Sequence, residues 1–368
     1  MSNSNKLKIL NDPIYGFVTI PNSLIYDVVQ HPYFQRLRRI SQMGMSYLVF
    51  PGAHHTRFHH ALGCMHLMQK AVSTLRFKGV SISNDEENAL YLAILLHDIG
   101  HGPFSHAMEY SIIEEVYHEN LSLKFMQALN TEFDNQLDLA IQIFKGEYHR
   151  KFMYQLISSQ LDVDRLDYLK RDSFYSGVTE GNINSERIIQ MLTVVDDALV
   201  VEEKGIYSVE HFLLARRLMY WQAYLHKTSL VAELILTKLF KRAKELAQAG
   251  KNIPATPALS FFLNQKVTND DFNDEVLAKF SLLDDSDVIA AIKTWMFEPD
   301  KILSKLSKML INRDLLKIEM KTERVDKEEV NRLRALLMQQ TGITYEEAKY
   351  LVFSGKIKNQ AYKKDSEA

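Results

Sequence analysis

Apolar side chains recur every three or four residues along most of this chain, the spacing that places them on one face of an α-helix. The strongest runs cover residues 58–75 and 87–96, and Pro32 suits the first helical position before a helix over 33–42. Residues 209–249 form either one long helix or two helices joined end to end. Shorter helices are predicted at 121–129, 136–144, 152–158 and 164–170, and again between Pro257 and about residue 310.

A second pattern, of short apolar runs around turn residues, predicts a few strands. Residues 7–20 form two strands around an Asn-Asp-Pro turn, and 193–207 form a β-hairpin. A strand over 315–322 and a helix over 327–340 make a small mixed unit before a polar tail. The fold class is therefore mainly α with short β-hairpins. Two domains are expected, residues 1–250 and residues 251–368, the second a helical and small α/β unit.

Composition narrows the classes of protein. The 368 residues are 46% hydrophobic, enough for a substantial core, and the formal net charge is −2. That balance does not favour a nucleic-acid binder built on bulk positive charge. The single cysteine, Cys64, permits no internal disulfide, and no apolar run is long enough to span a membrane. The N-terminal residues lack the pattern of a signal peptide, so we expect a cytoplasmic protein.

The segment HDIGHGPFSH, residues 97–106, combines three histidines and one aspartate directly after an apolar run. Imidazole and carboxylate together favour a divalent metal. His97 and Asp98 can both reach one ion if they lie at a helix end, where Gly100 frees the backbone. His60 and Asp164 would complete a shell of two histidines and two aspartates from separate helices. The alternative is that these are ordinary polar residues at helix ends. It does not explain why the segments that carry His60, His97-Asp98 and Asp164 occur together in this order.

Several further sequence motifs accompany that segment in a fixed order over residues 7–235. They are NDPIYG (11–16), FQRLRRISQMG (34–44), VFPGAHHTRFHHALG (49–63), HEN (118–120), DVDRLDYLKRD (162–172) and AYLHK (223–227). With these motifs the chain resembles the HD superfamily of metal-dependent phosphohydrolases. Within it, the chain is most similar to the deoxynucleoside triphosphate triphosphohydrolases, including members fused to a SAM domain. The resemblance implies that residues 1–250 form a helical HD domain.

The resemblance also implies roles for the catalytic and metal-binding residues. His60, His97, Asp98 and Asp164 match the metal ligands, and the ion would be Mg, Mn, Fe, Co, Ni or Zn. His118 matches a general acid toward the 5′-oxygen of the sugar. Glu109 stands where the family often has an aspartate that pairs with this histidine. His101 and His106 match positions near the α-phosphate.

The remaining matched positions contact the substrate in the family. Arg57, Arg165 and Tyr168 match residues that contact phosphates, and Arg216 matches an arginine on the outer phosphates. A triphosphate carries about four negative charges, so a local set of arginines suits it. The residues that match those around the deoxyribose and its 3′-hydroxyl are Gln42, Asp172 and Tyr224. His54, His55 and His59 receive no role and are expected to be surface or loop histidines.

The sequence thus predicts an enzyme that hydrolyses a deoxynucleoside triphosphate to deoxynucleoside and tripolyphosphate. Two alternatives stay open: an HD phosphohydrolase acting on another nucleotide phosphate ester, and a regulator that binds nucleotides or nucleic acid with weak activity. The resemblance implies a homo-oligomer, a dimer or tetramer, with Asn11 and Arg38 near a subunit boundary and a regulatory nucleotide there. Gln30 stands where activated relatives carry an acidic residue that reads guanine, so weak guanine preference is expected.

Overall fold

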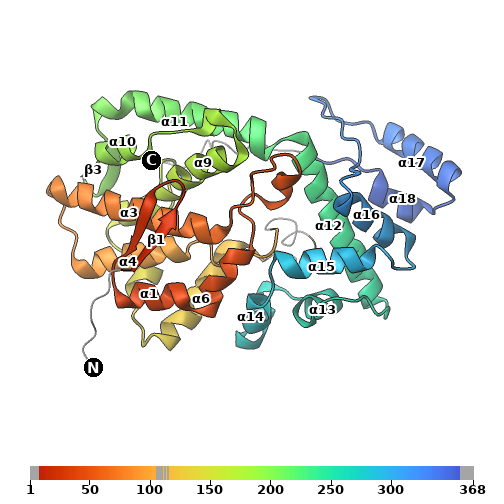
Figure 1. Cartoon of the computed structure of the whole chain (residues 1–368), viewed down its shortest axis with the longest axis horizontal. Coiled ribbons are helices and arrows are strands. Elements are labelled where there is room, and N and C mark those ends of the chain that lie inside the picture. Colours follow the sequence, from red (N-terminus) through yellow and green to blue (C-terminus); the bar gives the residue numbers. More distant parts are fainter. Residues whose placement is uncertain (1–7, 105–110, 112, 114–115, 357–368) are drawn as a thin grey trace.

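The chain is dominated by helices, as the periodicity predicts (Figure 1). The computed structural model describes residues 8–104, 111, 113 and 116–356. Within these residues, strands form only two separate two-stranded antiparallel sheets. The prediction of a mainly α-helical fold with short β-hairpins is confirmed.

The first part of the chain carries the two hairpins and a group of packed helices. The hairpins are β1 (Lys8–Asp12) with β2 (Gly16–Ile20), and β3 (Leu192–Val195) with β4 (Ala198–Val201). The α-helices are α1 (Ser23–Gln30), α2 (Pro32–Gln35), α3 (Arg57–Phe77), α4 (Asn84–Leu96), α6 (His118–Glu132), α7 (Asp138–Phe144), α8 (Lys151–Ile157), α9 (Val163–Ser176), α10 (Ser185–Met191) and α11 (Ile206–Met219). Short 3₁₀ segments are η1 (Arg36–Arg39), η2 (Gly44–Leu48), η3 (Thr179–Gly181) and η4 (Glu203–Gly205).

The long region 209–249 is two helices, not one. A π-helical segment, η5 (Tyr220–Tyr224), separates α11 from α12 (Lys227–Gln248). In Figure 1, α12 leads from the first group of helices to the C-terminal ones. These are α13 (Pro257–Asn264), the 3₁₀ turn η6 (Asn269–Asp271), α14 (Asp274–Ser281), α15 (Asp285–Trp295), α16 (Lys301–Ile311), α17 (Lys327–Thr341) and α18 (Tyr345–Leu351).

Three helices form the centre of the first part, because α3 packs against both α4 and α9. Residues 89–96 at the end of α4 are buried on every side, as their unbroken apolar run predicts. Ser83 and Glu86 form a reciprocal capping box at the start of α4, and Thr56 and His59 form one at the start of α3. These packed helices bring the start of α3, the end of α4 and the start of α9 together.

The N-terminal hairpin forms where the Asn-Asp-Pro turn predicts it. Asp12 Oδ1 accepts hydrogen bonds from the backbone N–H groups of Ile14 (2.9 Å) and Tyr15 (3.0 Å), which closes the turn. Gly16 follows with a φ of +76°, a conformation that favours glycine. The turn therefore depends on one oxygen of a single carboxylate.

Two predicted elements are wrong. The predicted helix over 33–42 ends early, since α2 stops at Gln35 and a 3₁₀ turn follows. The next residues leave the helical conformation because they make contacts with distant parts of the chain. Arg36 is turned fully inward, and Ser41 pairs with Thr56 in an isolated β-bridge. The strand over 315–322 does not form, since no strand of the described residues runs beside this segment to share its hydrogen bonds.

The loop after α4 is held by contacts from both parts of the chain. Arg36 donates to the carbonyl oxygens of Ile99 (2.7 Å) and His101 (2.9 Å). Asp285, at the start of α15, accepts from the backbone N–H groups of Ser41 (2.8 Å) and Phe104 (3.0 Å). The C-terminal helices thus support the same loop. We propose a domain boundary at residue 250, which the two Asp285 contacts cross.

No helix in the described part of the chain is both long enough and apolar enough to cross a membrane.

Candidate metal centre and active site

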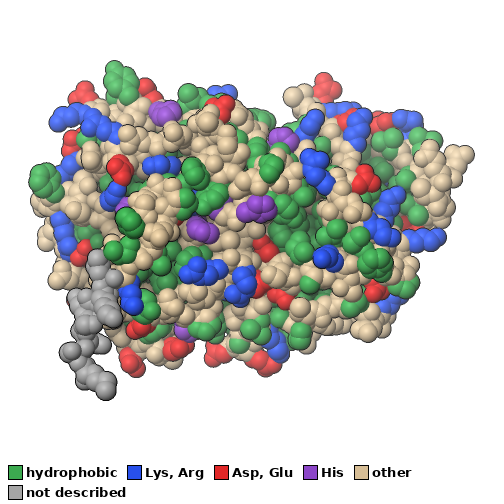
Figure 2. Space-filling view, in the orientation of Figure 1, with side chains coloured by type: hydrophobic (Ala, Val, Ile, Leu, Met, Phe, Trp, Pro, Cys, Tyr) green, Lys and Arg blue, Asp and Glu red, His purple; other side chains and the backbone are tan. Residues whose placement is uncertain are grey.

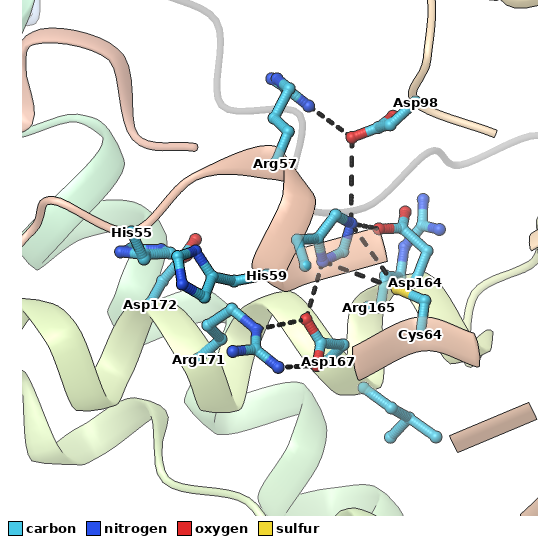
Figure 3. A network of polar contacts seen from close by, with 12 residues as sticks. His55, Arg57, His59, Cys64, Asp98, Asp164, Arg165, Asp167, Arg171 and Asp172 are labelled. Carbon is cyan, nitrogen blue, oxygen red and sulfur yellow. Dashed lines mark hydrogen bonds and ion pairs between the residues drawn. The ribbon is translucent and has the colours of Figure 1, made fainter. Parts of the chain in front are cut away.

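Two histidines and two aspartates meet where α3, α4 and α9 converge, and Figure 3 labels the two aspartates, Asp98 and Asp164. His60 lies in the first turn of α3, and Asp164 lies in the first turn of α9. His60 Nε2 is 3.1 Å from Asp164 Oδ1 and 3.8 Å from Asp98 Oδ2. His97 Nε2 is 3.5 Å from Oδ1 of each of these two carboxylates. The structure therefore brings together the four residues that the sequence predicts as metal ligands.

In both histidine rings, the hydrogen bond made by Nδ1 determines the orientation and tautomer that Nε2 presents to the cluster. His97 Nδ1 donates to the Ile94 carbonyl oxygen at 2.6 Å, so Nε2 of the neutral ring carries a lone pair. That Nε2 is buried and has no hydrogen-bond partner within the described residues. His60 Nδ1 likewise donates to Asp167 Oδ2 at 2.8 Å. Both Nε2 atoms thus face the carboxylates as ligands do in metal sites, and the four residues fit a divalent cation.

The charge balance of this cluster also suits a cation. Burial raises the pKa of Asp164, but the adjacent His60 and His97 lower it by more, leaving it well below its usual value. Burial lowers the pKa of His97, while Asp98 and Asp164 raise it to a net increase. Positive charge is therefore favoured between these groups, and a divalent cation would supply it.

Cys64 lies one helical turn after His60 and is close enough to be grouped with the cluster. Its Sγ is 3.5 Å from His60 Nδ1. Burial raises the pKa of the Cys64 thiol far above its usual range. Its Sγ is about equally far from both ring nitrogens of His60, at 3.5 and 3.6 Å, so we assign Cys64 to packing against that ring.

A second pair of histidines lies beside Asp98. The rings of His101 and His118 have centroids 3.9 Å apart, and His101 Nδ1 is 3.6 Å from Asp98 Oδ1. His118 begins α6, which packs tightly on the loop after α4: a Cβ on Gly100 would lie 2.2 Å from the His118 carbonyl oxygen. Glycine at position 100 therefore allows α6 to bring His118 to the cluster. His106 and Glu109, predicted as neighbours of this pair, lie outside the described residues.

A second polar group forms around Asp172 at the far end of α9. Its two oxygens accept from His55 Nε2 (2.6 Å) and from the Tyr224 hydroxyl (2.8 Å). The Gln42 backbone N–H donates to the His55 carbonyl oxygen, and the buried Gln42 Oε1 has no hydrogen-bond partner within the described residues. Tyr168 is one helical turn before Asp172 on α9, and its ring centroid is 6.1 Å from that of Tyr224. The predicted sugar-binding residues are thus gathered in one place.

The three predicted phosphate-binding arginines have carboxylate or amide partners. Arg57 pairs with Asp98, and Arg165 pairs with Asp162, the residue that caps α9. Arg216, on α11, donates to the Gln160 side chain at 3.1 Å and is buried. All three guanidinium groups are therefore held in position, two of them against acidic groups of the α4 end and the α9 start.

His54 and His55 lie in the loop before α3, as expected, but His55 is only 1% exposed and stacks on Tyr175 at 4.4 Å. His59 instead lies in the first turn of α3, so the expectation of a surface or loop histidine is wrong for His59.

Asp167 and Arg171 belong to the motif DVDRLDYLKRD, but the motif by itself predicts no role for them. Their spacing from Asp164 by three and seven residues places them within reach of α3, a signal that helical geometry offered.

Comparisons with known proteins give a consistent result. The sequence model of the HD domain matches residues 57–172, and that of the HD-associated region matches residues 183–255. A phosphohydrolase of solved structure from Bacteroides thetaiotaomicron is 54% identical, with a TM-score of 0.92 over 94% of this chain and 86% of that chain. The uncharacterized protein YwfO of Bacillus subtilis is 38% identical over 84% of this chain and 71% of its own length.

A third relative has a named activity. The deoxynucleoside triphosphate triphosphohydrolase SAMHD1 homolog of Dictyostelium discoideum is 30% identical over 68% of this chain. The chain spans 52% of the length of that protein.

Replacing Asp164 by Ala should remove the bound divalent ion, because Asp164 Oδ1 approaches Nε2 of both histidines. Metal content measured by mass spectrometry after gel filtration should fall from about one ion per chain to a small fraction, with circular dichroism unchanged. Asp27→Ala, at an exposed position of α1, is the control and should keep its metal. Full metal content in Asp164→Ala would rule out Asp164 as a ligand.

Proposed function

The chain belongs to the HD-domain phosphohydrolases, and on this premise we propose that it hydrolyses deoxynucleoside triphosphates to a deoxynucleoside and tripolyphosphate. The observation that carries the proposal is the layout of α9. Asp164, Tyr168 and Asp172 are four residues apart and therefore share one face of the helix, over about 12 Å. One end of this face lies at the His and Asp cluster, and the other at the group formed with His55 and Tyr224.

This layout suits a nucleotide better than a small phosphate ester. The cluster end carries Arg57 and Arg165, which can bind phosphate oxygens by bidentate, charge-assisted hydrogen bonds. The Asp172 end carries hydrogen-bonding groups fit for a sugar hydroxyl, including the Gln42 side-chain oxygen without a partner in the described residues. The relatives named as deoxynucleoside triphosphate triphosphohydrolases support the same substrate class.

In the proposed mechanism, His60, His97, Asp98 and Asp164 would hold a divalent metal. When bound, such an ion would polarise a phosphoryl oxygen and lower the pKa of water toward neutrality. Arg57, Arg165 and Arg216 bind the phosphates and balance their charge, while Tyr168 and Tyr224 line the path between phosphate and sugar. Asp172 would hold the 3′-hydroxyl, with His55 and Tyr224 fixing the orientation of its carboxylate.

We assign to His118 the role of giving a proton to the departing 5′-oxygen. A histidine titrates near neutral pH, so it can donate to an alkoxide that would otherwise leave as a strong base. Its ring contacts that of His101, which approaches Asp98. His101 therefore links the proton donor to the metal-binding carboxylate.

Product analysis tests the proposed reaction. The protein is incubated with each of the four deoxynucleoside triphosphates, and in parallel with ribonucleotides, monophosphates and cyclic nucleotides, in Mg²⁺, Mn²⁺, Fe²⁺ or Co²⁺. We expect deoxynucleoside and tripolyphosphate in equal amounts by anion-exchange chromatography, and none from Asp164→Ala. Pyrophosphate or inorganic phosphate as the first product would identify a different phosphohydrolase. Nucleic-acid binding without turnover would support a regulator instead.

His118→Ala should keep its metal and lose rate by roughly 10²–10⁴-fold, the usual contribution of a general acid. Single-turnover rates and metal content are measured on the same preparations, with His149→Ala, an exposed histidine, as control. Because His118 also groups with Asp98 and His101 in metal-binding range, the metal measurement is decisive. A variant that loses its ion would make His118 a ligand and overturn its assignment as acid.

We also propose that the protein is a homo-oligomer that pairs through α11 and the start of η5. Tyr207, Leu214 and Trp221 are 79%, 53% and 51% exposed and are seven residues apart, so they line one side of the helix. A second copy running antiparallel, with its dyad near Leu214, places each Tyr207 against Trp221 of the other. The exposed Glu210 and Arg217 then meet with opposite charge.

A regulatory nucleotide at another subunit boundary belongs to the same proposal. Asn11 and Gln30 are exposed, and the Arg38 guanidinium lies 3.6 Å over the Phe58 ring. With an amide at position 30 instead of a carboxylate, we expect weak preference for guanine in any activating nucleotide.

Leu214→Lys should reduce the assembly, since it places two like charges at the proposed dyad. Light scattering on the eluting protein should give a multiple of the chain mass for the wild type and a smaller mass for the variant. Leu234→Lys, at an exposed apolar position of α12, is the matched control and should elute as the wild type does. A wild type that is monomeric at every concentration would contradict the interface.

A further inference from the structure

A buried chain of charged groups extends from the metal cluster to the N-terminal hairpin. Its first link is His60, whose Nδ1 donates to Asp167 Oδ2 at 2.8 Å while Nε2 faces Asp164. The side chains of His60 and Asp167 are both fully buried. Asp167 therefore sets the tautomer and the ring plane of His60, and with them the direction of the Nε2 lone pair.

The second link is a two-point ion pair along α9. Arg171 Nε donates to Asp167 Oδ2 at 2.9 Å, and Arg171 Nη2 donates to Asp167 Oδ1 at 3.0 Å (Figure 3). Both partners are fully buried. A bidentate pair allows little rotation of the carboxylate, so Arg171 restricts the group that orients His60.

The third link joins α9 to the hairpin. Arg171 Nη1 donates to Asp12 Oδ2 at 2.8 Å, and Asp12 is itself buried. The other Asp12 oxygen accepts the backbone N–H groups of Ile14 and Tyr15 that close the turn. One carboxylate thus both builds the hairpin turn and pairs with Arg171.

The neighbouring helix α3 leaves space for these charged side chains. Gly63 lies in α3, and a Cβ at that position would be 2.1 Å from Asp167 Oδ1 and 2.2 Å from Arg171 Nη2. Glycine within a helix lowers its stability relative to alanine. Its presence here, one turn from His60, is explained by the close approach of the ion pair to the helix that carries the ligand.

We propose that Asp167, Arg171 and Asp12 are positioning residues for the metal ligand His60, so that the N-terminal hairpin is a working part of the metal centre. The inference rests on the metal-binding part of the proposed function, and it does not depend on which nucleotide is hydrolysed. Because coupling between sites is reciprocal, ion binding should also stabilise the hairpin.

A purely structural ion pair would behave differently. Its loss would lower the melting temperature of the metal-free protein and leave the affinity for the ion unchanged. A positioning role predicts weaker ion binding by the folded variant, typically by 10- to 100-fold for a residue that orients a ligand. Affinity for the metal alone, measured without substrate, separates the two.

The variants are Asp167→Asn and Asp12→Asn, which keep the side-chain shape and one acceptor oxygen. Asp300→Asn is the matched control, because Asp300 accepts a similar two-point pair from Arg242 (3.1 and 2.5 Å) and caps α16 away from the cluster. Metal-free proteins are titrated with Mn²⁺ and the free ion is followed by electron paramagnetic resonance. Melting temperatures of the metal-free proteins are recorded in parallel.

We expect the Mn²⁺ dissociation constant to rise about 10- to 100-fold in Asp167→Asn, to rise less in Asp12→Asn, and to stay unchanged in Asp300→Asn. In the wild type, Mn²⁺ should slow amide hydrogen exchange in residues 8–20 more than in the β3–β4 hairpin. This last measurement needs no variant, so it tests the inference even if Asp167→Asn does not fold.

Wild-type Mn²⁺ affinity in a folded Asp167→Asn would overturn the positioning role. Unchanged affinity in Asp12→Asn, or equal protection of both hairpins, would remove the hairpin from the metal centre. A wild type that binds Mn²⁺ and shows these shifts, yet releases no tripolyphosphate, would disprove the proposed reaction and uphold the inference. A wild type that binds no Mn²⁺ would overturn both.

Discussion

Several carboxylates are buried at one point of this protein, and the surrounding structure depends on how their charge is balanced. A buried carboxylate is stable only with cations or hydrogen-bond donors around it. Asp167 has Arg171 and His60; burial raises its pKa, but these two partners bring it down to about 2. Asp98 has Arg57, and Asp98 and Asp164 both face the two histidines. With both histidines neutral, these three carboxylates outnumber the two arginines paired with them, and a divalent cation would balance the difference.

Helix α9 organises the site because two of its faces carry residues with different roles. Positions 164, 168 and 172 follow one face, from the metal cluster toward Tyr224. Positions 167 and 171 follow another, which lies against α3 and the N-terminal hairpin. A single rigid helix thus holds a proposed metal ligand, the group that orients another ligand, and the proposed sugar contact at set separations.

The loop after α4 is irregular, and its position is maintained by contacts from distant parts of the chain. Arg36, in the 3₁₀ segment η1, donates to two carbonyl oxygens of this loop, and its guanidinium lies over the rings of Phe125 and Phe280. Asp285 binds the same loop from α15. Figure 2 shows histidines gathered near the middle of the molecular face, with the C-terminal helices on one side of them. The C-terminal helices therefore support the geometry of the site without supplying its predicted ligands.

The sequence by itself determined the helical class, most helix positions, the two hairpins and the set of His and Asp residues that meet. These follow from local periodicity, turn residues and short motifs, which a linear chain displays directly. Only the tertiary structure decided that residues 36–39 leave the helical path, that 315–322 form no strand, and that His55 turns inward to Asp172. It alone revealed the Asp12–Arg171–Asp167 chain behind His60. Each of these depends on partners far apart in sequence, whose contact energies exceed local preferences and leave no periodic trace in the chain.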